Sequence, residues 1–170
     1  MYTRQKVSIC NFQLFGQTLF VALTFFILFI NTAAAEFGSN IIENGGFEVI
    51  DSGVHPKGWS YQGKTDSDIF YQGNKSLIIS LSDTSKTFVS QTVPVVGNSV
   101  YTMSGWTRTE NITKKFYYMV EWRDTNKQFI SSNSSTFLVG TSEWQSLTYT
   151  FPSAPPNAEF ASFSLRLDGP

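Results

Sequence analysis

The sequence predicts an all-β protein, an antiparallel β-sandwich or jelly roll, and three observations lead to this fold class. Apolar and polar residues alternate in several short runs, as they do in strands with one buried face. Turn-forming residues separate these runs. No stretch after Glu36 places apolar residues at helical spacing over three turns. Roughly eight or more such strands in one domain are expected to pack as two sheets.

The chain opens with the three parts of a secretory signal. Arg4 and Lys6 are basic, residues 19–30 form an apolar run, and small residues precede the expected cleavage point between Ala35 and Glu36. A membrane-spanning helix needs about 20 apolar residues, whereas this run has 12. We therefore favour a cleaved signal peptide over residues 1–35, rather than an uncleaved anchor, and a protein that is secreted or held at the cell surface.

We expect a single domain over residues 36–170, built from strands that follow one another with little between them. Leu77, Ile79 and Leu81 would share one side of a strand, and Pro94 and Pro152 would each end one. The expected strands, in order, lie at 77–81, 89–93, 101–104, 115–124, 147–151 and 161–167. Because the last run stops just before the chain does, we expect either that the sequence is a fragment or that the sheet lacks its last strand.

Composition argues against several classes of function. With 12 Lys and Arg against 13 Asp and Glu, the net charge is -1, so the sequence predicts no nucleic-acid partner. One Cys cannot form an internal disulfide, and one His cannot form a multi-histidine zinc site. That histidine, His55, lies in a run of turn-forming residues and is expected to be an exposed loop residue. We therefore expect no enzyme activity, and a glycosidase is the weakest alternative.

The aromatic residues, 16% of the chain, are more informative. In residues 115–124, one side of the expected strand carries Tyr117, Glu121 and Arg123, while the other side reads as core. Trp106 falls on the polar side of its own strand. Sugars stack on aromatic rings and pair their hydroxyls with planar acids and guanidinium groups. We expect these four residues to bind carbohydrate; alternatively, the aromatics fill a second packing layer or lie under a loop.

Six segments stand out by their order and spacing: 40–48 (NIIENGGFE), 58–59 (GW), 73–77 (GNKSL), 90–93 (SQTV), 100–108 (VYTMSGWTR) and 141–152 (TSEWQSLTYTFP). Together they resemble the carbohydrate-binding modules of the CenC type, which have a galactose-binding-like jelly-roll fold. The resemblance implies a non-catalytic module that binds polysaccharide or oligosaccharide in an aromatic-lined groove, with further domains of a larger secreted protein beside it. The alternative is a structural or adhesive module of a cell-surface protein, with a similar fold and a filled groove.

The same resemblance implies a structural calcium ion. Family members hold it between the first strand, the turn before the "S-L" strand and an acid in the final strand. Glu48 matches the first position, and the backbone carbonyl of Lys75 matches the turn. The acid has no counterpart before Pro170, and an ordinary surface role for Glu48 stays open beside the calcium role.

Overall fold

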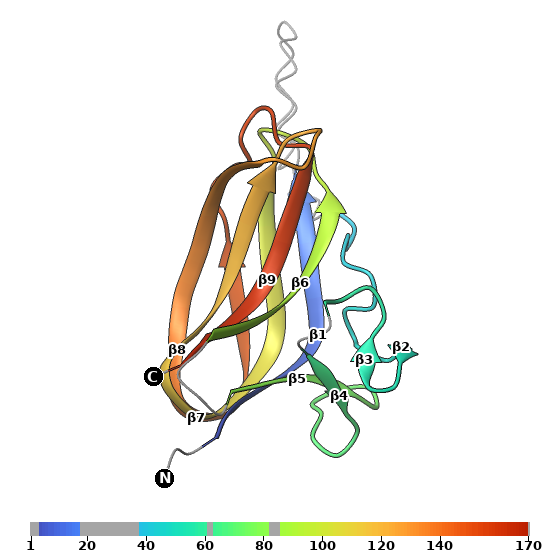
Figure 1. Cartoon of the computed structure of the whole chain (residues 1–170), viewed down its shortest axis with the longest axis vertical. Coiled ribbons are helices and arrows are strands. Elements are labelled where there is room, and N and C mark those ends of the chain that lie inside the picture. The colour runs from blue at the N-terminus through green and yellow to red at the C-terminus, as the bar shows by residue number, and fades with distance from the viewer. Residues whose placement is uncertain (1–3, 18–37, 61–62, 82–85, 170) are drawn as a thin grey trace, which may run out of the picture.

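The fold of the protein is all-β and antiparallel, as predicted (Figure 1). The computed structural model describes residues 4–17, 38–60, 63–81 and 86–169 of the 170-residue chain. No helix occurs within these ranges, and in this part of the chain nothing helical is long and apolar enough to cross a membrane. The strands are β1 (Gln5–Gln17), β2 (Ile50–Ser52), β3 (His55–Pro56), β4 (Lys64–Asp66), β5 (Ser76–Leu81), β6 (Lys86–Pro94), β7 (Val100–Arg123), β8 (Phe129–Thr150) and β9 (Phe160–Asp168).

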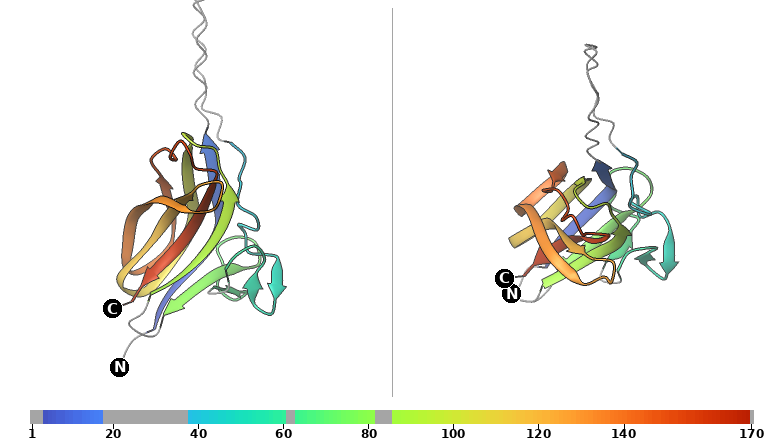
Figure 2. Two further views of the ribbon diagram at one scale, coloured as in Figure 1. Left: turned by 45° about the horizontal axis from the view of Figure 1, so that its top comes forward. Right: turned by 90° about the horizontal axis from the view of Figure 1, so that it is seen from above.

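The two longest strands, β7 and β8, connect two layers of a sandwich (Figure 2). The sheet runs in the order β4-β5-β1-β7-β9-β6, and β8 pairs with β7. The first half of β7, up to Glu110, pairs with β1, whereas its second half, from Lys115, pairs with β9. The first half therefore belongs to one layer with β1, β4 and β5, and the second half to the other layer with β6 and β9.

The core lies between the layers and follows the alternation predicted from the sequence. Leu77 and Ile79 are fully buried, and so are Phe163 and Leu165 on the last strand. Trp122 is also fully buried and packs against Phe163 with ring centroids 6.0 Å apart. Sheets with one buried face keep this period of two because successive side chains point to opposite sides.

The buried side of β7 changes in the middle of the strand. Tyr101 and Met103 are buried in the first half, at odd positions, whereas Phe116 and Tyr118 are buried in the second half, at even positions. Between them Asn111 has a φ of 55°, and the register with β8 shifts on either side of Ile112. A residue in the left-handed region together with a bulge reverses which side chains face the core.

Residues 5–17 are part of this sheet. They form β1, which lies between β5 and β7, with Val7 and Ile9 fully buried. The cleavage point predicted near Ala35 lies outside the described residues, so the signal peptide stays a prediction. Cleavage there would remove a strand from the interior of the sheet.

Candidate functional site

Three of the four side chains predicted to bind a ligand lie together, and the fourth does not. Tyr117, Glu121 and Arg123 share the outer side of the second half of β7, where their strand pairs with β9. Trp106 lies on the outer side of the first half, between Cys10 of β1 and Ser146 of β8. Because the buried side reverses near Asn111, the two groups lie on opposite faces of the sandwich.

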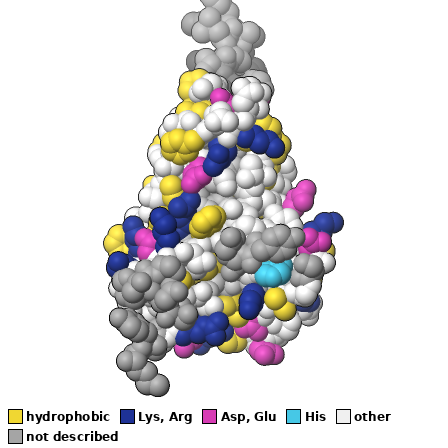
Figure 3. All heavy atoms as spheres, viewed as in Figure 1, with side chains coloured by type: hydrophobic (Ala, Val, Ile, Leu, Met, Phe, Trp, Pro, Cys, Tyr) yellow, Lys and Arg dark blue, Asp and Glu magenta, His cyan; other side chains and the backbone are white. Residues whose placement is uncertain are grey.

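The face with Tyr117, Glu121 and Arg123 combines aromatic rings with guanidinium groups in two rows across the strands. Cross-strand neighbours at one end are Phe88, Arg166, Tyr117 and Phe137, and those at the other end are Pro94, Phe160, Arg123 and Phe129. Ser162, Ser164, Met119 and Glu121 occupy the space between the rows. We call the outer side of β6, β9, the second half of β7 and the first half of β8 the arginine face. Figure 3 views the molecule from the side of β6 and β9 and shows Lys and Arg side chains gathered beside hydrophobic and acidic ones.

Glu121 holds the two arginines of this face in place. Its Oε1 atom accepts a hydrogen bond from Arg166 at 2.7 Å, and its Oε2 atom accepts one from Arg123 at 2.8 Å. Arg166 also donates to the Ser164 hydroxyl, and Arg123 donates to the Lys127 carbonyl oxygen. The side chains of Glu121, Arg123 and Arg166 are 23%, 31% and 16% exposed. The network is thus fixed in geometry and still reached by solvent.

Cations also lie over aromatic rings at both ends of the arginine face. The Arg166 guanidinium lies 5.1 Å from the centroid of the Phe88 ring, and the Lys127 ammonium lies 5.3 Å from that of Phe160. Phe129 and Phe137, on the β8 side, are 59% and 61% exposed. With Phe88 at the β6 edge, which is 37% exposed, these rings leave aromatic surface open to a partner on the arginine face.

The surroundings of Trp106 are different. Tyr71 stacks on the Trp106 ring with centroids 4.0 Å apart, and Trp144 packs against Tyr71 at 5.9 Å. The backbone N–H of Tyr71 donates to the Cys10 sulfur, which fixes the covering segment to β1. Trp106 therefore lies beneath a loop, the alternative raised for these aromatics from the sequence.

The residues predicted to hold calcium are close together but engaged with each other. Glu48 Oε1 accepts the backbone N–H groups of Asn74 at 2.7 Å and Lys75 at 3.2 Å. The Lys75 carbonyl oxygen accepts from the Cys10 thiol at 3.4 Å. Calcium takes six to eight oxygen ligands, and no group of three or more His, Cys, Asp or Glu side chains comes together within the described ranges. The calcium site stays a prediction.

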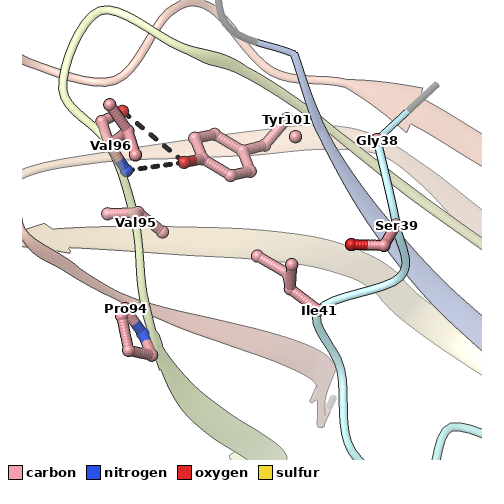
Figure 4. A pocket seen from close by; sticks show the side chains of 8 residues that line it. Gly38, Ser39, Ile41, Pro94, Val95, Val96 and Tyr101 are labelled. Atoms are coloured by element: carbon pink, nitrogen blue, oxygen red, sulfur yellow. Dashed lines mark hydrogen bonds between the residues drawn. The ribbon is translucent and has the colours of Figure 1, made fainter. Parts of the chain in front are cut away.

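Two hollows elsewhere in the molecule lack this combination of groups. One, of about 270 Å³, is lined by Ile41, Pro94 and Val95, and Figure 4 shows its Tyr101 hydroxyl bonded to Val96, with the Val96 N–H donating at 2.7 Å. The other, of about 240 Å³, contains basic side chains, but the residues that line it include no aromatic ring; they are Arg4, Lys6, Lys64, Thr65, Ile78 and Ser80. The arginine face is thus the stronger candidate site.

Comparison with known proteins finds relatives among tRNA nucleases. No family model matches the chain. A tRNA(Glu)-specific nuclease WapA of Bacillus subtilis subsp. natto is 29% identical over 142 residues, which cover 76% of this chain and 6% of the relative. A tRNA nuclease WapA of Bacillus subtilis and a tRNA3(Ser)-specific nuclease WapA of Bacillus spizizenii are 28% identical, with the same coverage. The chain therefore spans about 6% of the length of these relatives.

These relatives contradict the function predicted from the sequence. We predicted non-catalytic binding of polysaccharide, no enzyme activity and no nucleic-acid partner, whereas the relatives are named as nucleases that act on tRNA. Those predictions are wrong on this evidence. The physical reason is that an aromatic ring beside an acid and a guanidinium suits a nucleotide as well as a sugar, because bases stack and phosphates bind arginine.

Sequence reasoning also missed part of the arginine face. Arg166 and Phe88 come from β9 and β6, and only the sheet pairing brings them beside Tyr117. The alternation around Arg166 was visible in the sequence, with Leu165 and Leu167 as its buried neighbours. That pattern predicted an outward guanidinium but gave no information about the strands beside it.

Proposed function

We propose that this chain is a domain of a protein that acts on tRNA as a nuclease, and that it contacts the RNA through the arginine face. The observation that carries the proposal is a pair of guanidinium groups, Arg123 and Arg166, held on either side of the Glu121 carboxylate and flanked by aromatic rings. The names of the relatives support RNA as the partner.

The two arginines keep hydrogen-bonding capacity for a phosphate. A guanidinium has five N–H donors, and the contacts described above use two of them on each side chain. Arginine binds phosphate oxygens through two parallel N–H groups, which makes it better suited than lysine to hold a phosphodiester in a fixed orientation.

The exposed rings supply surfaces for bases. Phe137 and Phe129 project from β8 at opposite ends of the arginine face, and Phe88 lies at the edge formed by β6. Sheets that bind single-stranded RNA use aromatic side chains in this way, and each stacked base contributes about 1–3 kcal/mol. Stacking needs an unpaired base, so we expect the arginine face to bind the single-stranded loops of tRNA rather than its stems.

The test is binding of the full chain to tRNA, to a short unpaired RNA and to an RNA duplex, measured by fluorescence anisotropy at two salt concentrations. Arg166→Ala and Arg123→Ala should each weaken binding and reduce the slope of log K against log salt by about 0.7, the value for one phosphate contact on a single strand. Phe137→Ala should weaken binding with little effect on the slope.

Arg108→Ala is the matched control. Arg108 also projects from β7 and pairs with an acid, Glu143, at 3.3 Å, but it lies on the opposite face. Its loss should leave RNA binding unchanged. Equal effects of Arg108→Ala and Arg166→Ala would contradict the proposal, as would equal affinity for the duplex and the unpaired RNA. The same samples, analysed for tRNA fragments, show whether the chain itself cleaves RNA.

A further inference from the structure

The first strand of the chain lies in the interior of the sheet. β1 pairs antiparallel with β7 over residues 6–10 and 13–17, and its first part, residues 5–9, also pairs antiparallel with β5 on the other edge. Between its end at Gln17 and the next described residue, Gly38, there are twenty residues outside the described ranges.

The position that β1 fills, which we call the channel between β5 and β7, is lined by residues that pack against the apolar side chains of β1. Val7, Ile9, Phe12 and Leu14 of β1 are fully buried. The Phe12 ring contacts Trp59 and Tyr118, with centroids 5.5 and 5.6 Å apart. Gly105 of β7 leaves room for that ring, because a Cβ atom there would come within 3.2 Å of it.

Backbone contacts fix the register of the segment at a bulge between Cys10 and Gln13. There the Phe12 N–H donates to the Gly45 carbonyl oxygen at 2.7 Å, and the Leu14 N–H donates to Asn40 Oδ1 at 2.9 Å. The Leu14 carbonyl in turn accepts from the Ile41 N–H at 3.0 Å. Residues 40–45 thus bind β1 at the bulge and just after it.

We propose that the channel between β5 and β7 is a strand-binding site, which residues 5–17 occupy here and which accepts an extended peptide of the same pattern supplied in trans. Such a site gains affinity from main-chain hydrogen bonds, to β7 over residues 6–10 and 13–17 and to β5 over residues 5–9, and specificity from the buried alternate side chains. Without a strand, two edges would be left unpaired and the core would be open to water. Removal of residues 1–35 as a signal peptide would create that vacancy. The inference does not depend on RNA binding.

The experiment uses the full chain with a specific protease site placed between Gln17 and Gly38. The purified protein is cut, unfolded in urea and refolded with an excess of a fluorescent peptide of residues 4–17. The matched control peptide carries Ile9→Asp, which would bury a charge at a fully enclosed position. Incorporation is measured by size-exclusion chromatography and native mass spectrometry.

The proposal expects the unaltered peptide to enter the refolded protein in place of the released strand, and the Ile9→Asp peptide to bind at least about tenfold more weakly. Two results would overturn it. In one, the cut protein refolds to the same unfolding midpoint after β1 has been washed away. In the other, both peptides are incorporated equally, which would mean that the site does not select for apolar side chains at the buried positions.

Discussion

The two halves of β7 both alternate between buried and outward residues, but they differ in the side chains that they bury and in the strands that they pair with. The second half carries its own core, because Phe116, Tyr118 and Trp122 are fully buried. The first half buries Tyr101 and Met103 at its start, but from Gly105 to Thr109 its inward residues are small or polar. Apolar side chains of β1 fill the space above them.

The outer sides of the two halves differ in the same way. In the second half, one carboxylate joins two guanidinium groups, and aromatic rings around them remain exposed. In the first half, Arg108 pairs with Glu143 alone, and Trp106 is covered by Tyr71. Both halves carry an aromatic residue and an arginine on their outer side. Whether such a pair forms a ligand-binding surface therefore depends on the side chains that neighbouring strands and loops place around it.

The largest expected effect is on the core. Trp122→Ala removes the largest buried ring of the second half and its hydrogen bond to Asn133, and should lower the free energy of unfolding by about 3–5 kcal/mol. Ile9→Ala should cost about 2–5 kcal/mol, because β1 supplies the core of the first half. Urea unfolding of the full chain measures both. No change for Ile9→Ala would show that β1 is not part of the folded core.

Substitutions of Asn111 test whether its left-handed backbone conformation stabilises the junction between the two halves of β7. Its left-handed backbone conformation disfavours a side chain such as that of alanine, so Asn111→Ala should destabilise the protein by about 1 kcal/mol. Asn111→Gly should be neutral or slightly stabilising because glycine adopts this conformation without strain. Thermal or urea unfolding of the two variants provides the measurement. If alanine and glycine behave alike, the reversal of the buried side does not depend on this residue.

Glu121→Gln tests whether the acid that joins Arg123 and Arg166 limits their binding to RNA. Neutralising this acid frees both guanidinium groups for phosphate, so RNA affinity should rise by a few-fold and depend more steeply on salt. The ion pairs are partly exposed, so the loss of stability should be no more than about 1 kcal/mol. Glu143→Gln, which frees Arg108 on the other face, is the control and should not change RNA affinity. A fall in affinity for Glu121→Gln would mean that the carboxylate orients the arginines for RNA.

The smallest expected effect is a loss of stability at alkaline pH. Burial raises the pKa of the Cys10 thiol above its ordinary value of 9.0 and the pKa of the Tyr118 hydroxyl above its ordinary value of 10.0. Above about pH 9 the unfolded chain therefore binds fewer protons than the folded one, and stability falls as pH rises. Urea unfolding at pH 8, 9 and 10 should show this fall, and Cys10→Ala should make it shallower between pH 9 and 10. A parallel fall in the variant would assign the effect to other groups.

Much of the fold could be predicted from the sequence because local alternation reports which side of a strand is buried. Leu77, Ile79, Phe163 and Leu165 are buried as predicted. Three of the four predicted site residues also lie together, since they alternate along one uninterrupted stretch of β7. Trp106 was grouped with them wrongly, because the reversal at Asn111 depends on a bulge that the residue types do not reveal.

From the sequence alone it follows that the protein is all-β, that alternate residues of β5, β9 and the second half of β7 are buried, and that Tyr117, Glu121 and Arg123 share one side of a strand. These properties follow from side chains that alternate along a single strand. Only the tertiary structure decided that Arg166 binds Glu121 from a strand 45 residues later, that Tyr71 covers Trp106, and that residues 5–17 lie between β5 and β7. Those contacts depend on the pairing and packing of distant segments, and a period of two along one strand does not select its neighbours.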